Sequence, residues 1–135
     1  MIRQLDERTL VSGQVAPHEV AGLAEQGITM LVNNRPDGEE DGQPFASEIE
    51  EAAARAGIGY RFVPIIRGIG PADIEVMQQA LRETGDGKLL AFCRSGTRSA
   101  FAVALAKREE GASADEVSNC LVSAGFVPSP IADLL

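Results

Sequence analysis

The chain has 135 residues, and its 12 Lys and Arg against 20 Asp and Glu leave a formal net charge of −8. At roughly 100–200 residues per domain, this length predicts a single domain, residues 1–135. The acidic balance, without any basic cluster, argues against nucleic-acid and membrane partners. An anionic ligand would therefore need a local cationic site.

The two cysteines form no CxxC pair and the chain has a single histidine, which argues against a disulfide framework and a zinc-type site. We accordingly expect no cofactor and no metal. The first eight residues are polar and contain no apolar signal region, and the longest apolar runs are far too short to span a membrane. A cytoplasmic location is expected, where thiols stay reduced. No feature of the sequence requires an oligomer.

Predicted helices and strands alternate along the chain. A helix from Pro17 to Gln26 precedes the apolar strand Ile28 to Asn33, which is of the kind that is buried on both faces of a parallel sheet. After a polar loop over 34–44, a helix, a strand, a helix and a third strand are expected over 46–56, 59–64, 71–84 and 88–92. Three more helices are expected near 99–110, 113–124 and 128–135. This order predicts an α/β fold with a central, mainly parallel sheet flanked by helices, and ligands bind such sheets beyond the carboxyl ends of the strands.

The segment that carries chemistry follows the third strand directly and reads Cys93-Arg94-Ser95-Gly96-Thr97-Arg98-Ser99. A cysteine between a strand and a helix faces backbone N–H groups and the positive end of the helix dipole, and these favour the thiolate. Gly96 lets the loop curl so that its N–H groups converge on an anion, and Arg98 adds a forked donor. A cysteine of the apolar core would not explain a glycine and two arginines so close by. The segment therefore predicts a thiolate that lies in an anion-binding loop.

At these residues the sequence resembles known families. The Cys-x-x-Gly-x-Arg-Ser pattern is similar to the active-site loop of rhodanese sulfurtransferases. The chain as a whole resembles the phosphatase-like domain of beta-lactamase-hydrolase-like proteins, a family similar to dual-specificity protein tyrosine phosphatases. The segments that carry this resemblance are residues 11–14, 32–39 and 60–64 and the Cys93 loop.

The second resemblance implies a cysteine-phosphatase-like fold and a phosphoric monoester hydrolase. In such an enzyme Cys93 attacks phosphorus to form a phosphocysteine, Arg98 holds the phosphoryl oxygens, and the hydroxyl of Ser99 eases departure of the thiolate. The remaining loop residues would bind the substrate, namely Arg94, Ser95, Gly96 and Thr97.

Three features depart from the phosphatase pattern. Four residues separate Cys93 from Arg98 where five are usual, and Phe92 stands where a histidine is usual. The stretch Ile65 to Gly68 also lacks the aspartate that protonates the leaving group. Another acid would have to take that role.

The nearest aspartate, Asp73, is predicted to interact with a helix dipole in the first turn. The other candidate acids lie on the loop after the first core strand: Asp37, Glu39, Glu40 and Asp41. Asp37 is preferred because the segment Arg35-Pro36-Asp37 belongs to the resemblance. The alternative, a solvated turn, stays open.

Two other functions are compatible with the same loop. A rhodanese-type sulfurtransferase would carry a persulfide on Cys93 and needs no strong general acid. A non-catalytic anion-binding or thiol-redox module would use the loop without turnover. In either catalytic case Arg35 and Arg67 would help to hold a small anionic substrate, a phosphate ester or a sulfane-sulfur donor, unless they pair with neighbouring acids.

Overall fold

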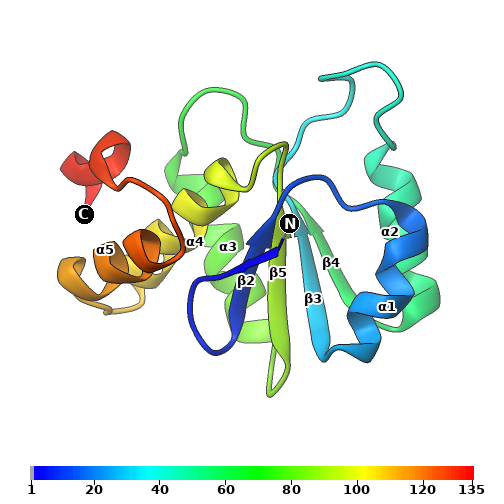
Figure 1. Cartoon of the computed structure of the whole chain (residues 1–135), viewed down its shortest axis with the longest axis horizontal. Coiled ribbons are helices and arrows are strands. Elements are labelled where there is room, and N and C mark those ends of the chain that lie inside the picture. Colours follow the sequence, from blue (N-terminus) through cyan, green and yellow to red (C-terminus); the bar gives the residue numbers. More distant parts are fainter. Residues whose placement is uncertain (1) are drawn as a thin grey trace.

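The computed structural model describes residues 2–135 and is built on a five-stranded sheet in the order β1-β2-β5-β3-β4 (Figure 1). The four strands from β2 to β4 in this order run parallel, and β1 pairs antiparallel with β2 at the edge. The strands are β1 (Ile2–Gln4), β2 (Thr9–Ser12), β3 (Ile28–Asn33), β4 (Gly59–Phe62) and β5 (Lys88–Phe92). The predicted α/β fold with a central, mainly parallel sheet is confirmed.

Helices cover both faces of this sheet. Two lie on one face, on the right of Figure 1: α1 (Val20–Glu25) and α2 (Ala46–Ala56). The other face carries α3 (Pro71–Glu83) and α4 (Thr97–Glu109), and α5 (Ala114–Ser123) packs against α4. Two 3-10 helices complete the chain, η1 (Pro17–Glu19) and η2 (Ser129–Leu134). Within residues 2–135, no helix has the length and apolar content to cross a bilayer.

The two central strands send alternate side chains into the two layers. Met30 of β3 packs with the α3 and α4 side, whereas Leu31 packs with α1 and α2. In β5, Leu89 packs on the α3 and α4 side and Leu90 on the α1 and α2 side, since successive side chains of a strand point to opposite faces. Both strands are therefore buried on both sides, as their apolar sequences predict.

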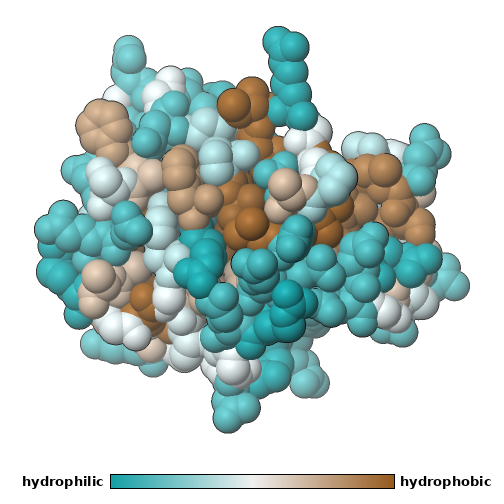
Figure 2. All heavy atoms as spheres, turned by 180° about the vertical axis from the view of Figure 1, so that it is seen from behind, coloured by the Kyte–Doolittle hydropathy of each residue, from teal (hydrophilic) through white to brown (hydrophobic). Residues whose placement is uncertain are grey.

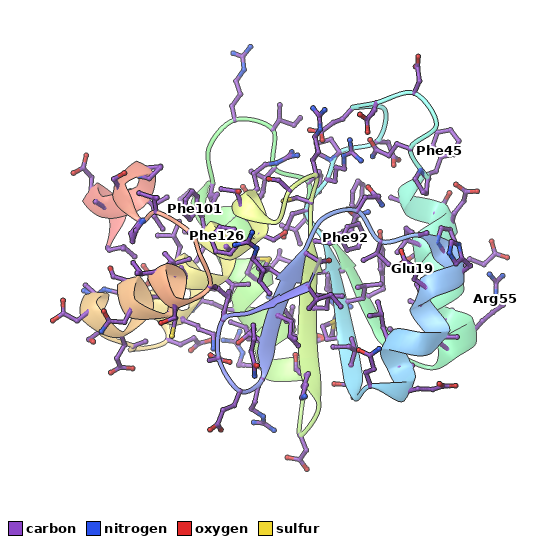
Figure 3. The ribbon with its side chains drawn as sticks, in the orientation of Figure 1. Glu19, Phe45, Arg55, Phe92, Phe101 and Phe126 are labelled. Atoms are coloured by element: carbon purple, nitrogen blue, oxygen red, sulfur yellow. The ribbon has the colours of Figure 1, made fainter. Side chains whose placement is uncertain are left out.

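The register of the two central strands positions the functional loops. Asn33, the last residue of β3, lies opposite Phe92, the last residue of β5. Phe92 is fully buried, on the α1 and α2 side of the sheet (Figure 3). Asn34 and Cys93 consequently begin two loops at the same edge, beside the loops that follow β2 and β4 (top of Figure 1).

The structure differs from the predicted elements at both ends of the chain. Strands β1 and β2 were not predicted, because β1 is exposed along its length and β2 has only four residues. The predicted last helix is a 3-10 helix, since Pro128 and Pro130 remove two backbone N–H donors there. Helix α4 begins at Thr97, two residues before the predicted start.

Candidate active site

Cys93 lies fully buried where β5 leads into α4. Its Sγ accepts a hydrogen bond of 3.1 Å from the Gly96 N–H. Gly96 is the N-cap of α4, and its φ of +93° lies in the left-handed region that favours glycine. The loop therefore bends the start of α4 onto the sulfur, and the positive end of the helix dipole faces it.

The loop after β2 packs against this segment. The Cys93 N–H donates to the Ser12 carbonyl at 3.3 Å. A Cβ on Gly13 would lie 3.0 Å from the Arg94 carbonyl oxygen, closer than almost all real Cβ contacts. The absence of a side chain at Gly13 therefore allows the two loops to pack closely.

Ser99 makes its hydrogen bond to Asn34, a residue that the sequence analysis did not select. The Ser99 Oγ donates to Asn34 Oδ1 at 2.8 Å, and both residues are fully buried. The Asn34 amide nitrogen donates to the Val63 carbonyl at 3.0 Å, which directs its oxygen toward Ser99. The Asn34 backbone N–H donates to the Phe92 carbonyl at 2.8 Å. The hydrogen bonds of Asn34 thus link the ends of β3, β4 and β5 to the first turn of α4.

The guanidinium of Arg98 is held by Glu39 in a bidentate ion pair. Nη1 donates to Glu39 Oε2 at 2.8 Å and Nη2 donates to Oε1 at 2.9 Å. Nη1 also donates to the Ile65 carbonyl at 2.8 Å. The bonds to Glu39 are the main reason that the pKa of Arg98 is raised, and the nearby Cys93 contributes in the same direction. Arg98 is therefore fixed in orientation and lies close to the thiol.

Glu39 stays ionised because two arginines contact its carboxylate. Its pKa is lowered from 4.5 to about 2, chiefly by the hydrogen bonds from Arg98 and then, against a smaller opposing effect of burial, by those from Arg35. The Arg35 side chain is buried, and its Nε donates to Glu39 Oε1 at 2.9 Å. Its other two nitrogens donate to Gln14 Oε1 at 3.0 Å and Glu40 Oε1 at 3.3 Å. The sequence predicts Glu39 only as a candidate acid, and no local pattern indicates its contact with Arg98.

The other predicted substrate-binding residues lie at the solvent side of the loop. The Arg94 side chain is 66% exposed and contacts Glu40 Oε2 at 3.5 Å. The Ser95 hydroxyl donates to Thr97 Oγ1 at 3.1 Å. Arg67 is exposed on the loop between β4 and α3 and forms no ion pair with residues 2–135. The structure thus brings Arg35, Arg94 and Arg98 together through Glu39 and Glu40, while Arg67 stays apart from this group.

Two of the three candidate aspartates contact the start of a helix, and the third, Asp41, is exposed. Asp37 Oδ1 accepts a hydrogen bond of 2.7 Å from the N–H of Ala46, the first residue of α2. Asp73 Oδ2 accepts one of 2.9 Å from the Gly70 N–H at the start of α3, as predicted for a first-turn residue. No group of three His, Cys, Asp or Glu side chains in the described part of the chain is arranged to hold a metal ion.

A buried cysteine at the end of a central parallel strand, an arginine in the next helical turn and helices on both faces define a cysteine-phosphatase-like fold. Solved structures confirm this fold. The crystal structure of PTPMT1 in complex with PI(5)P matches over 98% of this chain and 91% of its own, with a TM-score of 0.74 at 16% identity, a likeness that concerns the fold.

The family model for the beta-lactamase hydrolase-like protein, phosphatase-like domain, matches residues 1–110, and the chain belongs to this family. A beta-lactamase hydrolase-like protein of Xylella fastidiosa is 40% identical over 111 residues, which are 82% of this chain. The matched part is 26% of that relative, so the chain corresponds to about a quarter of its length. A crystal structure of a candidate phosphatase from Neisseria meningitidis is 30% identical, covers 98% of this chain and 94% of its own, and has a TM-score of 0.77.

Proposed function

We propose that the chain is a cysteine-dependent phosphatase with the Cys93 thiolate as its nucleophile. The observation that carries this proposal is the Gly96 N–H donating to Cys93 Sγ at 3.1 Å, at the start of the helix whose second residue, Arg98, lies close to the same thiol. A thiolate at that position has a preformed set of anion-binding groups around it, which is what attack on a phosphoryl group requires. The phosphatase-like family supports hydrolase chemistry.

The proposed reaction has two steps. The Cys93 sulfur attacks phosphorus, the S–P bond forms, and the P–O bond to the leaving group breaks. The loop N–H groups and Arg98 hold the phosphoryl oxygens throughout. Water then hydrolyses the phosphocysteine, which releases inorganic phosphate and regenerates the thiolate. For Ser99 to ease that departure, its hydroxyl proton would have to turn from Asn34 to the sulfur, because a hydroxyl donates only one proton.

Asp37 is the proposed general acid for the first step. Glu39 is unsuited to the role, since a carboxyl with a pKa of about 2 carries no proton at neutral pH. Glu40 is paired with Arg35 and Arg94. Within residues 2–135, Asp37 has no arginine partner and its carboxylate accepts only the Ala46 N–H, which it would release on moving toward a substrate.

The proposed substrate is a small anionic phosphate ester. The exposed Arg94 is available to an incoming anion at the loop, on a chain whose overall charge is −8. Long-range repulsion from that charge disfavours strongly acidic macromolecules. The PTPMT1 structure holds PI(5)P on the same fold, which is consistent with a phosphorylated ligand.

A second candidate function, sulfur transfer, is favoured by the length of the loop. Four residues separate Cys93 from Arg98, the spacing of the rhodanese-like loop. In this reaction the Cys93 thiolate takes the sulfane sulfur of thiosulfate and releases sulfite. Cyanide then takes that sulfur from the persulfide and leaves as thiocyanate, which restores the thiolate.

Two assays on the same preparations distinguish these functions. The wild type, Cys93→Ser and the matched control Cys120→Ser are each given an aryl phosphate and, separately, thiosulfate with cyanide. We expect phosphate release by the wild type and the control that Cys93→Ser abolishes. Thiocyanate formation without phosphate release would instead assign sulfur transfer. Absence of activity in both assays, with vanadate still bound, would indicate a non-catalytic anion-binding module.

A further inference from the structure

An apolar pocket of about 270 Å³ adjoins Arg98. It lies where the loop after β4 meets α4 and η2. Arg98 is the one charged residue among the described residues that line it, and most of the others are apolar. The apolar walls include Ile65, Ile66, Ile69, Phe101, Ile131 and Leu134.

The walls of this pocket combine a buried base with an exposed rim. Ile65 and Ile131 are 2% and 6% exposed, whereas Ile66 and Leu134 at the rim are 76% and 61% exposed. Phe101 belongs to α4 and lies beside the C-terminal segment (Figure 3). Figure 2, which views the molecule from behind, shows apolar side chains gathered on this part of the surface. The rim therefore leaves apolar area in water that a ligand could cover.

Arg98 belongs both to this pocket and to the anion-binding loop. Its Nη1 donates to the Ile65 carbonyl at 2.8 Å, so the pocket wall and the guanidinium are fixed to each other. A phosphoryl group that contacts Arg98 and Cys93 would thus have the pocket on the other side of the same arginine. An organic group that extends from that phosphoryl past the Arg98 side chain would enter the pocket.

We propose that this pocket binds the apolar organic group of the substrate, so that the chain selects aryl or alkyl phosphates over sugar phosphates. The inference rests on the proposed function and names its substrate class. The volume suits one aromatic ring or a short alkyl chain, below the roughly 300–1,000 Å³ of pockets for drug-sized ligands. A sugar would bury hydroxyl groups against isoleucine and phenylalanine side chains without hydrogen-bond partners, which is unfavourable.

Equilibrium binding of phosphonates tests the proposal without requiring turnover. Methyl-, butyl- and hexylphosphonate share one anionic head and differ only in apolar length. A fully buried methylene strengthens binding by about fourfold, so we expect hexylphosphonate to bind at least tenfold more tightly than methylphosphonate, measured by calorimetry. The variant Ile66→Ser should reduce the ratio of these two affinities severalfold. Val122→Ser is the matched control, since Val122 is 61% exposed on α5 and does not line the pocket.

Each contrary outcome identifies what has failed. Equal affinities across the series would overturn the pocket assignment and leave the proposed phosphatase intact. An unchanged ratio in Ile66→Ser would also overturn it. No binding of any phosphonate would overturn the proposed function, and this inference with it. Self-association that Ile66→Ser abolishes would show that a second copy of the chain covers the pocket, which also contradicts the proposal.

Discussion

The carboxylate of Glu39 accepts two hydrogen bonds, of 2.8 and 2.9 Å, from the guanidinium of Arg98, although the two residues are 59 positions apart in the sequence. The buried Arg35 side chain donates a hydrogen bond to the same carboxylate. A guanidinium that is fixed in this way loses little freedom when it binds an anion, since its orientation is already set. Glu39 is therefore a positioning residue in the proposed reaction, acting through Arg98.

Replacing Glu39 by glutamine should lower kcat/KM for an aryl phosphate by about tenfold, because a neutral amide holds the guanidinium less firmly. If the role is positioning, kcat should fall more than KM rises. Glu40→Gln is the matched control, since Glu40 contacts Arg94 at the exposed side of the loop. Equal effects of the two substitutions would refute a special role for Glu39.

The low pKa of Glu39 also predicts a pH dependence of stability. Because folding lowers this pKa from 4.5 to about 2, the ion pair stabilises the folded chain fully above pH 4.5 and loses its effect as pH falls toward 2. Urea unfolding of the wild type and Glu39→Gln should therefore differ most above pH 5 and converge near pH 2. A difference that stays constant over this range would contradict the assignment.

Asn34→Ala should destabilise the fold by about 1–3 kcal/mol, because it leaves the buried Ser99 hydroxyl and the Val63 carbonyl without their partner. Ser99→Ala removes one of the same hydrogen bonds. The double variant should then be less destabilised than the sum of the two single variants, as measured by denaturant unfolding. Strict additivity would show that the two side chains do not interact.

Gly96→Ala should destabilise the chain by about 1–2 kcal/mol, because a residue with a Cβ is strained at a φ of +93°. It should also weaken vanadate binding, since the Gly96 N–H faces the Cys93 sulfur. Gly22→Ala is a suitable control, because Gly22 lies inside α1 with open space around its Cα. Unchanged vanadate affinity in Gly96→Ala would show that the loop geometry is not needed for anion binding.

Asp37→Asn should retain the fold, because the amide oxygen can still accept the Ala46 N–H. If Asp37 is the general acid, turnover of an alkyl phosphate should fall by about 100-fold, whereas an aryl phosphate with a good leaving group should be nearly unaffected. The comparison of the two substrates within one variant controls for loss of folded protein. Equal turnover of the alkyl phosphate would eliminate Asp37 as the acid.

The central part of the fold could be predicted because its signals are local. Strands β3 and β5 are continuous apolar runs, and Gly57 in the left-handed conformation ends α2 where the sequence predicts a stop. Strand β1 gives no such signal, since all its residues are exposed and it is held by pairing with β2. Its existence depends on a neighbour that the sequence pattern does not reveal.

The same distinction applies to the candidate site. Cys93, Gly96 and Arg98 lie within one loop, so their spacing alone predicted an anion-binding segment. Glu39 and Asn34 reach this loop only because β3 and β5 are neighbours in register, which places residues 59 and 65 positions apart side by side. Periodicity and composition contain no information on such contacts.

Trapping the covalent intermediate tests most directly whether Cys93 is the nucleophile. The chain is mixed with an aryl phosphate, quenched in acid within milliseconds and examined by peptide mass spectrometry. We expect the mass of one phosphoryl group on the peptide that contains Cys93, and none on the peptide that contains Cys120. A chain that turns over the substrate while Cys93 stays unmodified, or a peptide that gains one sulfur atom from thiosulfate and never a phosphoryl group, would contradict it.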